Sequence, residues 1–424
     1  MKLAQNIRVM VFTGIAFIVV AACSAQKAGA IDLYNNDDII TKLKKNQLMS
    51  EKDINEIRNS YPKLELMGSL QLQYSNSKAD SGSDRISDMF LRRANLRIVG
   101  HVSDKASFVF EPEYGRGEPS IKDAYFEYKH SMFEVFAGNH KLPFSAEALK
   151  SDIYLPFVER HLTSQIAPDR LPGASISAKA LNSRLIVQAG VWNSNLNSKA
   201  EAELINNKLA DNSIFSTNSG TTGSNILVKA ARIAYYSNGR DDFYAQEYGQ
   251  DGEENFSNGK SFGVGLSYFD SSAVNTDLAT NGLTGLNGAN AIEGDVLVRI
   301  WRVTGEFEYA KRNLDWWQYN FAQTSSVAVS SVQTSYSAQA SILVTPNLSL
   351  SLRQESFTYD NKDKVLKGAH GQDKDKWLTT GLNYYFKEQH TKLQANYISK
   401  DSTMPKGVDA SKSNEMLLQV TTYF

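Results

Sequence analysis

From residue 64 to the C-terminus, apolar and polar side chains alternate along the chain with a period of two. A run of this kind begins at Leu64, and the last one sets Leu418 and Val420 against Gln419 and Thr421. Such alternation is typical of β-strands, because successive side chains point to opposite faces. Each run is about 9–11 residues long, which is the span of a tilted strand across a bilayer. No helical period of comparable strength lies between the runs, so the sequence predicts an all-β fold.

The number of runs and the lengths of their connections predict a barrel. Short connections at residues 130–131 and 345–346 alternate with long polar ones at 139–172 and 193–225. An even number of strands with this alternation is typical of an up-and-down membrane barrel, with short turns in the periplasm and long loops outside. The connection 237–260 breaks the alternation, because it is long and acidic where a short turn is expected. We predict sixteen antiparallel strands, starting near Leu64, Met89, Ala106, Ile121, Met132, Gly173, Arg184, Ile226, Ser261, Ala291, Arg302, Gln333, Asn347, Lys376, Thr391 and Lys412.

Residues 1–30 have the pattern of a signal peptide. Lys2 and Arg8 precede an apolar stretch, and Ala28-Gly29-Ala30 is a small-residue cleavage site. The apolar stretch is shorter than the roughly 20 residues that a spanning helix needs. Cleavage would leave a mature chain that starts at Ile31 without cysteine, which excludes disulfides. A lipidated Cys23 remains an alternative.

Residues 31–62 have a different pattern from the barrel that we predict over 63–424. Asp37 and Asp38 precede an apolar-periodic run, and a second capping signal starts at Ser50 and ends at Asp53. Pro62 then stops the helical pattern. These signals predict a short periplasmic helical segment before the first strand.

Alternation alone does not distinguish a soluble sandwich from a membrane barrel, but three other features do. The strands are long, an export signal is present, and the chain ends in Tyr423-Phe424 on an alternating strand. A terminal aromatic on such a strand is the signal that outer-membrane barrels present for assembly, and Phe424 is our candidate. The net charge of −1 argues against nucleic acid as a partner. We therefore expect a transmembrane barrel in the bacterial outer membrane, with lipid around it.

Three segments carry a family resemblance. They read F-L-R-R-A-N-L-R-I-V-G at 90–100, F-E-V-F-A-G-N-H-K-L-P-F-S at 133–145 and E-R-H-L-T-S-Q-I-A-P-D-R-L-P-G at 159–173. In this order they resemble the phosphate-selective porin O and P family. The resemblance implies a sixteen-stranded barrel, a homotrimer, and a third loop that folds inward and narrows the pore. The matching basic positions are Arg92, Arg93, Lys141, Arg160 and Arg170.

Strand parity indicates which charges face the pore. Phe90, Ala94 and Leu96 share one face, which places Arg93 and Arg97 in the lumen and Arg92 on the apolar face. An arginine at the bilayer midplane costs roughly 2–4 kcal/mol, so an outward Arg92 has to lie near an interface or a subunit contact. Both signs of charge line the predicted wall, so we expect a weakly selective pore. The candidate constriction residues are Arg93, Arg97, Arg160, Arg170 and Lys141 on the basic side and Glu111, Asp123 and Glu127 on the acidic side.

The predicted function is that of a porin, which passes small hydrophilic solutes and ions by diffusion. The family resemblance adds anions and phosphate as candidate solutes. The chain has 6 histidines, and none lies in a nucleophile-elbow or zinc-protease motif, so we expect no enzyme activity, no metal and no cofactor. A surface-exposed structural or adhesive barrel without an open channel remains the alternative.

Overall fold

The computed structural model describes residues 31–32, 61–79, 85–117, 119–167, 169–195, 225–238, 260–271, 285–320, 325–361, 374–387, 390–403 and 411–424. The predicted signal peptide and most of the predicted helical segment lie outside these residues. The strands are β1 (Ile31–Asp32), β2 (Lys63–Ala79), β3 (Ile86–His101), β4 (Ala106–Glu113), β5 (Ser120–Lys129), β6 (Phe133–Lys141), β7 (Arg170–Ala180), β8 (Leu185–Asn195), β9 (Asn225–Tyr236), β10 (Lys260–Asp270), β11 (Gly285–Ile300), β12 (Val303–Asn320), β13 (Ser325–Thr345), β14 (Leu348–Asn361), β15 (Lys374–Lys387), β16 (Thr391–Thr403) and β17 (Ser411–Tyr423).

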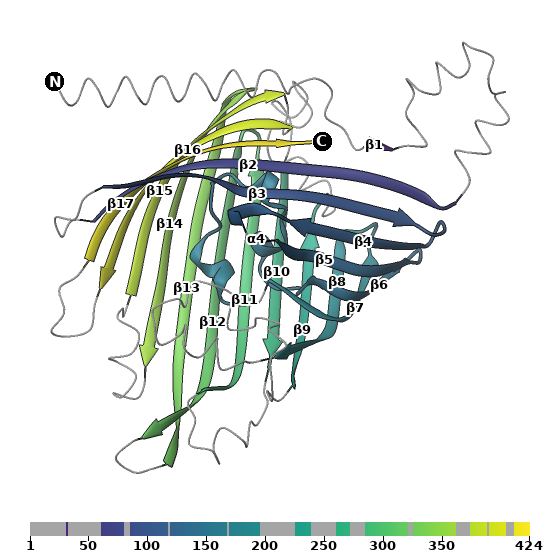
Figure 1. Cartoon of the computed structure of the whole chain (residues 1–424), viewed down its shortest axis with the longest axis horizontal. Coiled ribbons are helices and arrows are strands. Elements are labelled where there is room, and N and C mark those ends of the chain that lie inside the picture. Colours follow the sequence, from purple (N-terminus) through teal and green to yellow (C-terminus); the bar gives the residue numbers. More distant parts are fainter. Residues whose placement is uncertain are drawn as a thin grey trace.

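Strands β2 to β17 form a closed antiparallel barrel of sixteen strands. Each strand pairs with the next one along the chain, and β17 pairs with β2 to close the ring (Figure 1). The predicted fold class is therefore confirmed. β9 and β10 are antiparallel neighbours, with Tyr236 opposite Gly263, so the long connection 237–260 does not disturb the strand order.

Most strand starts agree with the alternation to within a few residues. The predicted length of 9–11 residues is confirmed for β5, β6, β7, β8 and β10 but is too short for most of the other strands. β13 has 21 residues and β12 has 18, well beyond the 9–11 that cross a bilayer. The largest error in a start is at β13, which begins at Ser325 rather than near Gln333. The residues that β13 adds read S-S-V-A-V-S-S-V. Serine and small apolar residues differ little in polarity, so this segment shows no clear alternation between an apolar and a polar face. The alternation pattern therefore predicts a strand that is shorter than β13.

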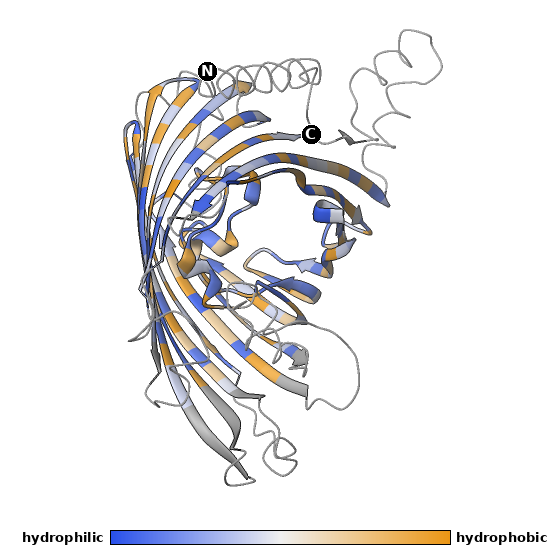
Figure 2. Ribbon diagram, turned by 60° about the vertical axis from the view of Figure 1, so that its left-hand side comes forward, coloured by the Kyte–Doolittle hydropathy of each residue, from blue (hydrophilic) through white to orange (hydrophobic). Residues whose placement is uncertain are grey.

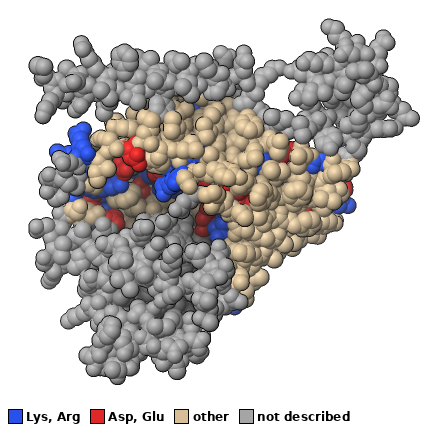
Figure 3. Space-filling view, viewed as in Figure 1, with Lys and Arg blue, Asp and Glu red and all other residues tan. Residues whose placement is uncertain are grey.

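The barrel is apolar outside and polar inside. Along β10, Phe262, Val264 and Leu266 are exposed, whereas Ser261 and Ser267 are buried. The same stripes run along the other strands (Figure 2), and the outer face of the barrel seen in Figure 3 is almost free of charged side chains. A soluble protein does not expose an apolar surface of this extent, because it costs free energy in water. The outer face therefore fits a lipid environment.

The C-terminal residue takes part in closing the barrel. The Phe424 amide donates to the Gly68 carbonyl at 3.0 Å, and the Gly68 amide donates to the Phe424 carbonyl at 3.1 Å. A Cβ at Gly68 would lie 2.5 Å from Cε1 of the Phe424 ring. The Phe424 ring thus covers Gly68 on the neighbouring strand. This contact stabilises the strand pairing at Gly68, which has no side chain of its own to pack.

The segment between β6 and β7, residues 142–169, crosses the barrel interior (Figure 2). It contains α4 (Ala146–Leu149), η2 (Asp152–Tyr154) and η3 (Leu162–Gln165). Its hydrogen bonds reach strands on the far side of the barrel: Ser145 donates to Glu308 on β12, the Leu162 amide to Glu355 on β14, and the Val158 amide to Asn396 on β16. We call this segment the inner loop. Among the described residues, no helix is long and apolar enough to span a membrane.

Apolar contacts hold the inner loop against one half of the wall. Leu142, Phe144 and Ile166 are buried in a cluster with Trp192 of β8 and Phe269 of β10. Burying side chains of this size contributes about 1.5–3 kcal/mol each. The loop is therefore held against β8–β14, and a second small cluster packs it against β16 and β17.

Candidate functional site

Two cavities lie between the inner loop and the wall. The first, which we call the lower cavity, has a volume of about 510 Å³ and extends to His390 and Phe424, at the end of the barrel where the short turns lie. The second, which we call the upper cavity, has a volume of about 760 Å³ and extends to Phe90 and Glu415, toward the opposite end of the barrel. Lys122, Asp152 and Arg170 line both cavities. These three residues therefore mark the position where the two cavities meet.

Asp152, in η2 of the inner loop, is the centre of the charges at this position. Its carboxylate lies 3.0 Å from Lys122 Nζ, 3.3 Å from Arg93 Nε and 2.6 Å from Arg160 Nη2. Burial alone would raise the pKa of Asp152, but the charges of Arg93, Lys122 and Arg160 hold it well below its ordinary value. The side chain is therefore ionised at neutral pH, and one carboxylate is shared by three cations.

The predicted wall charges form ion pairs on their own side of the barrel. Arg97 Nη1 lies 2.7 Å from Glu111 and 3.3 Å from Asp123, and Arg170 Nε lies 2.8 Å from Asp123. Arg93 also donates to Gln71 Oε1 at 2.7 Å. The predicted acids Glu111 and Asp123 thus lie beside the basic residues. This arrangement differs from the predicted one, in which an acidic side faces a basic side.

Two predicted basic residues hold the backbone of the inner loop. Lys141 Nζ donates to the carbonyls of Ala148 and Lys150, the latter at 2.9 Å. Arg160 donates to the carbonyls of Glu147 and Lys150 as well as to Asp152. Both side chains line a cavity, Lys141 the lower one and Arg160 the upper one. They fix the shape of the loop in addition to placing charge at the cavities.

The predicted acid Glu127 lies away from the other predicted site residues. It accepts a hydrogen bond from Ser107 and pairs with Lys129, near the turn after β5. It lines neither of the two cavities described above.

The predicted orientation of Arg92 was wrong. In the pairing of β2 with β3, Gln71 is opposite Arg93 while Leu72 is opposite Leu91, so Arg92 is an extra residue in a β-bulge. The bulge lets consecutive residues face the same side, and Arg92 makes two hydrogen bonds of 2.9 Å to Glu159 of the inner loop. Beyond the bulge the parity is reversed, and Phe90 lines the upper cavity instead of facing outward.

Lys122 and Asp152 were missed by the sequence reasoning. Glu111 of β4 is opposite Asp123 while Pro112 is opposite Ile121, so Lys122 is a second bulged residue. Pro112 carries no N–H for the strand ladder, and proline inside a sheet is a recognised sign of a bulge. This proline was the available signal for Lys122. Asp152 had no comparable signal, because its role depends on partners in β3 and β5.

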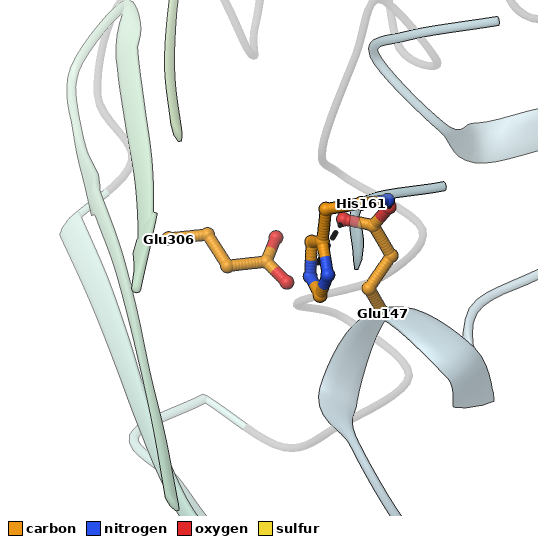
Figure 4. A group of neighbouring side chains, drawn as sticks. All are labelled: Glu147, His161 and Glu306. Carbon is orange, nitrogen blue, oxygen red and sulfur yellow. Dashed lines mark hydrogen bonds and ion pairs between the residues drawn. The ribbon is translucent and has the colours of Figure 1, made fainter. Parts of the chain in front are cut away.

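A buried polar cluster joins the inner loop to β12. Glu147, His161 and Glu306 have nitrogen and oxygen atoms within 4.8 Å of one another (Figure 4). Lys150 Nζ already lies 2.5 Å from Glu306. Burial alone would lower the pKa of His161, but Glu147 and Glu308 raise it to about 9. A protonated imidazole has no lone pair for a metal ion, so these donors fit an ion-paired anchor better than a metal centre.

Solved structures with a similar fold include proteins of bacterial outer membranes. The channel DcaP of Acinetobacter baumannii is 11% identical with a TM-score of 0.56, covering 86% of this chain and 97% of that one. The anion-selective porin of Comamonas acidovorans is 12% identical with a TM-score of 0.53, covering 86% and 100%. OmpT of Vibrio cholerae, in a trimer form, is 11% identical with a TM-score of 0.50, covering 86% and 100%. No curated protein matches this chain.

The family comparison covers nearly the whole barrel. The sequence profile of phosphate-selective porin O and P matches residues 64–423, which run from the second residue of β2 to the last residue of β17. This range includes the inner loop and, apart from Phe424, every residue that lines the two cavities. The chain therefore belongs to the phosphate-selective porin O and P family and is a porin of the bacterial outer membrane.

Proposed function

We propose that this porin is an open diffusion channel for small hydrophilic solutes and ions, narrowed where the inner loop meets the wall of β3–β7. The observation that carries the proposal is the pair of cavities that share Lys122, Asp152 and Arg170. One cavity extends to each end of the barrel, so a solute would pass from one to the other at these three side chains. A structural barrel with a plugged lumen would not need such a passage.

The charges support a weak preference for anions. Two of the three shared residues are basic and one is acidic. Five of the arginines that line the cavities have a carboxylate within 3.3 Å: Arg92, Arg93, Arg97, Arg160 and Arg170. Paired cations attract an anion less than a row of unpaired ones, such as anion-selective pores use. We therefore expect anions to be favoured modestly, without a tight phosphate site.

We also propose that the porin is a homotrimer and that its mature chain begins at Ile31. The family resemblance and the trimer form of the Vibrio cholerae OmpT fold support the first statement. The cleavage motif Ala28-Gly29-Ala30 supports the second. β1, which starts at Ile31, pairs with Leu66 and Glu65 of β2, so the proposed new N-terminus would lie against the barrel wall.

Thiol labelling of the passage tests the channel proposal. The Lys122→Cys variant would carry a single accessible cysteine once the leader is removed, since Cys23 is the only cysteine of the sequence. Addition of a bulky thiol reagent during recording in a planar bilayer should reduce the single-channel conductance. Lys105→Cys, on the exposed turn before β4, is the matched control and should give no reduction. A purified, folded protein without conductance, or a Lys122→Cys pore that labelling does not block, would contradict the proposal.

A further inference from the structure

The inner loop is tied to the far wall by one buried network around His161. Glu308 of β12 accepts hydrogen bonds from the Ser145 hydroxyl and the Glu147 amide, both at 2.7 Å. Glu147 in turn accepts the His161 amide at 2.9 Å. His161 Nε2 lies 3.2 Å from Glu147 and 3.6 Å from Glu308. One imidazole therefore lies between a carboxylate of the loop and a carboxylate of the wall.

The charge balance around this ring requires a further cation. The groups that face it are Glu147 of α4, Glu306 and Glu308 of β12, Gln339 of β13, Arg353 and Glu355 of β14, and Lys150 of the loop. Arg160 is engaged with Asp152. Four carboxylates thus meet two fixed cations, Lys150 and Arg353. Lys150 pairs with Glu306 and Arg353 with Glu355. A neutral His161 would therefore leave Glu147 and Glu308 without the cation that lies between them, which is costly.

The network is connected to the passage through the loop backbone. Glu147 and Lys150 offer the carbonyls that Arg160 binds, and Arg160 then contacts Asp152. The imidazole beside the far wall and the carboxylate of Asp152 are therefore linked by a short path of direct contacts. A shift of α4 relative to β12 would move Asp152 relative to Lys122.

We propose that His161 is a positioning residue whose imidazolium fixes the inner loop to β12 and thereby sets the width of the passage. This inference rests on the proposed function, because it presupposes that the passage conducts. Loss of the ring's charge leaves the carboxylates of Glu147 and Glu308 to repel each other without the cation between them. This repulsion loosens α4 from β12, so the loop moves and the pore closes transiently. The charge is fully present below the ordinary histidine pKa of 6.5 and is lost as the pH rises through about 9. The wild-type pore is therefore steady at neutral pH and closes more often in alkali.

Single-channel recording between pH 7 and pH 10 tests this role. In the wild type, the closure frequency should rise with a midpoint near pH 9. Glu308→Gln removes one of the carboxylates that favour the imidazolium, so the midpoint should fall by about 1–3 pH units. His161→Gln should close often at every pH and lose the pH dependence. His130→Gln, in the exposed turn after β5, is the matched control and should behave as the wild type.

A disulfide that locks the loop keeps the proposal testable if Glu308→Gln fails to fold. Thr163 of η3 and Ser335 of β13 are buried, and their hydroxyl oxygens lie 2.9 Å apart. The double variant Thr163→Cys with Ser335→Cys should suppress the alkaline closures when oxidised and regain them after reduction. Alkaline closures that persist with the disulfide formed, or an unshifted midpoint in a folded Glu308→Gln pore, would overturn the role of His161. A wild type that conducts at no pH would instead refute the proposed channel.

Discussion

Removing the charge of Asp152 is the sharpest perturbation of the passage. The Asp152→Asn variant keeps the size of the side chain, but Lys122, Arg93 and Arg160, which lie 2.6–3.3 Å from the carboxylate, lose their shared counter-charge. In bulk water, a unit charge changes the energy of an ion 4 Å away by about 1 kcal/mol. An energy of about 1 kcal/mol corresponds to about a fivefold change in a permeability ratio. We therefore expect the anion-to-cation permeability ratio to rise about fivefold.

The measurement is the reversal potential of the variant in a gradient of a simple salt. The shift should be largest near 0.1 M, where the screening length is about 10 Å, and should shrink near 1 M, where it is about 3 Å. Asp104→Asn removes the same charge from the exposed turn before β4 and serves as the control, with no expected shift. Slower migration after boiling would show that both variants are folded barrels. An unchanged reversal potential, or a shift toward cations, would refute the placement of Asp152 at the narrowest point.

Three further predictions concern assembly, processing and selectivity. Gly68→Val should lower the yield of folded barrel in a heat-modifiability gel, because overpacking against the Phe424 ring costs about 1–3 kcal/mol. Deletion of Phe424 should also lower this yield. Gly305→Val, where the nearest atom to a new Cβ is 3.9 Å away, should fold normally; equal yields would argue against the ring contact. Mass spectrometry of the mature protein should give an N-terminus at Ile31, and lipid on Cys23 would contradict it. Replacing Arg160 and Arg170 with Ala should shift the reversal potential toward cations, and no shift would show that the inner loop is not the filter.

The strands could be predicted from the sequence because each one lies between two solvents. Lipid outside and water inside impose the period of two directly on residues such as Leu418 and Gln419. The same rule failed at two bulges, in β3 and in β5, since one extra residue reverses the parity beyond it. Arg92 and Lys122 are both bulged residues, and they are the wall positions at which the orientation or the role was missed.

From the sequence, the site residues that lie in the family-like motifs could be predicted, but their partners could not. Arg93, Arg160 and Arg170 lie in segments that resemble the family, and all three line the upper cavity. Their partners have no local signal. Glu147 and Glu308 are 161 residues apart, and the carboxylate of one accepts the amide of the other only because the inner loop crosses the barrel. Contacts of this kind depend on closure of the whole barrel, so they cannot be read from neighbouring residues.

The reversal potential of the native pore in a salt gradient tests the central claim most directly. The passage is lined by two basic residues, Lys122 and Arg170, and one acidic residue, Asp152, and five of the arginines at the cavities are paired to carboxylates. This arrangement predicts conductance with a modest anion preference and no saturation at low phosphate. A folded protein that does not conduct would contradict the open passage. Strong anion selectivity that saturates at low phosphate would contradict the weakly selective passage and indicate a dedicated phosphate site.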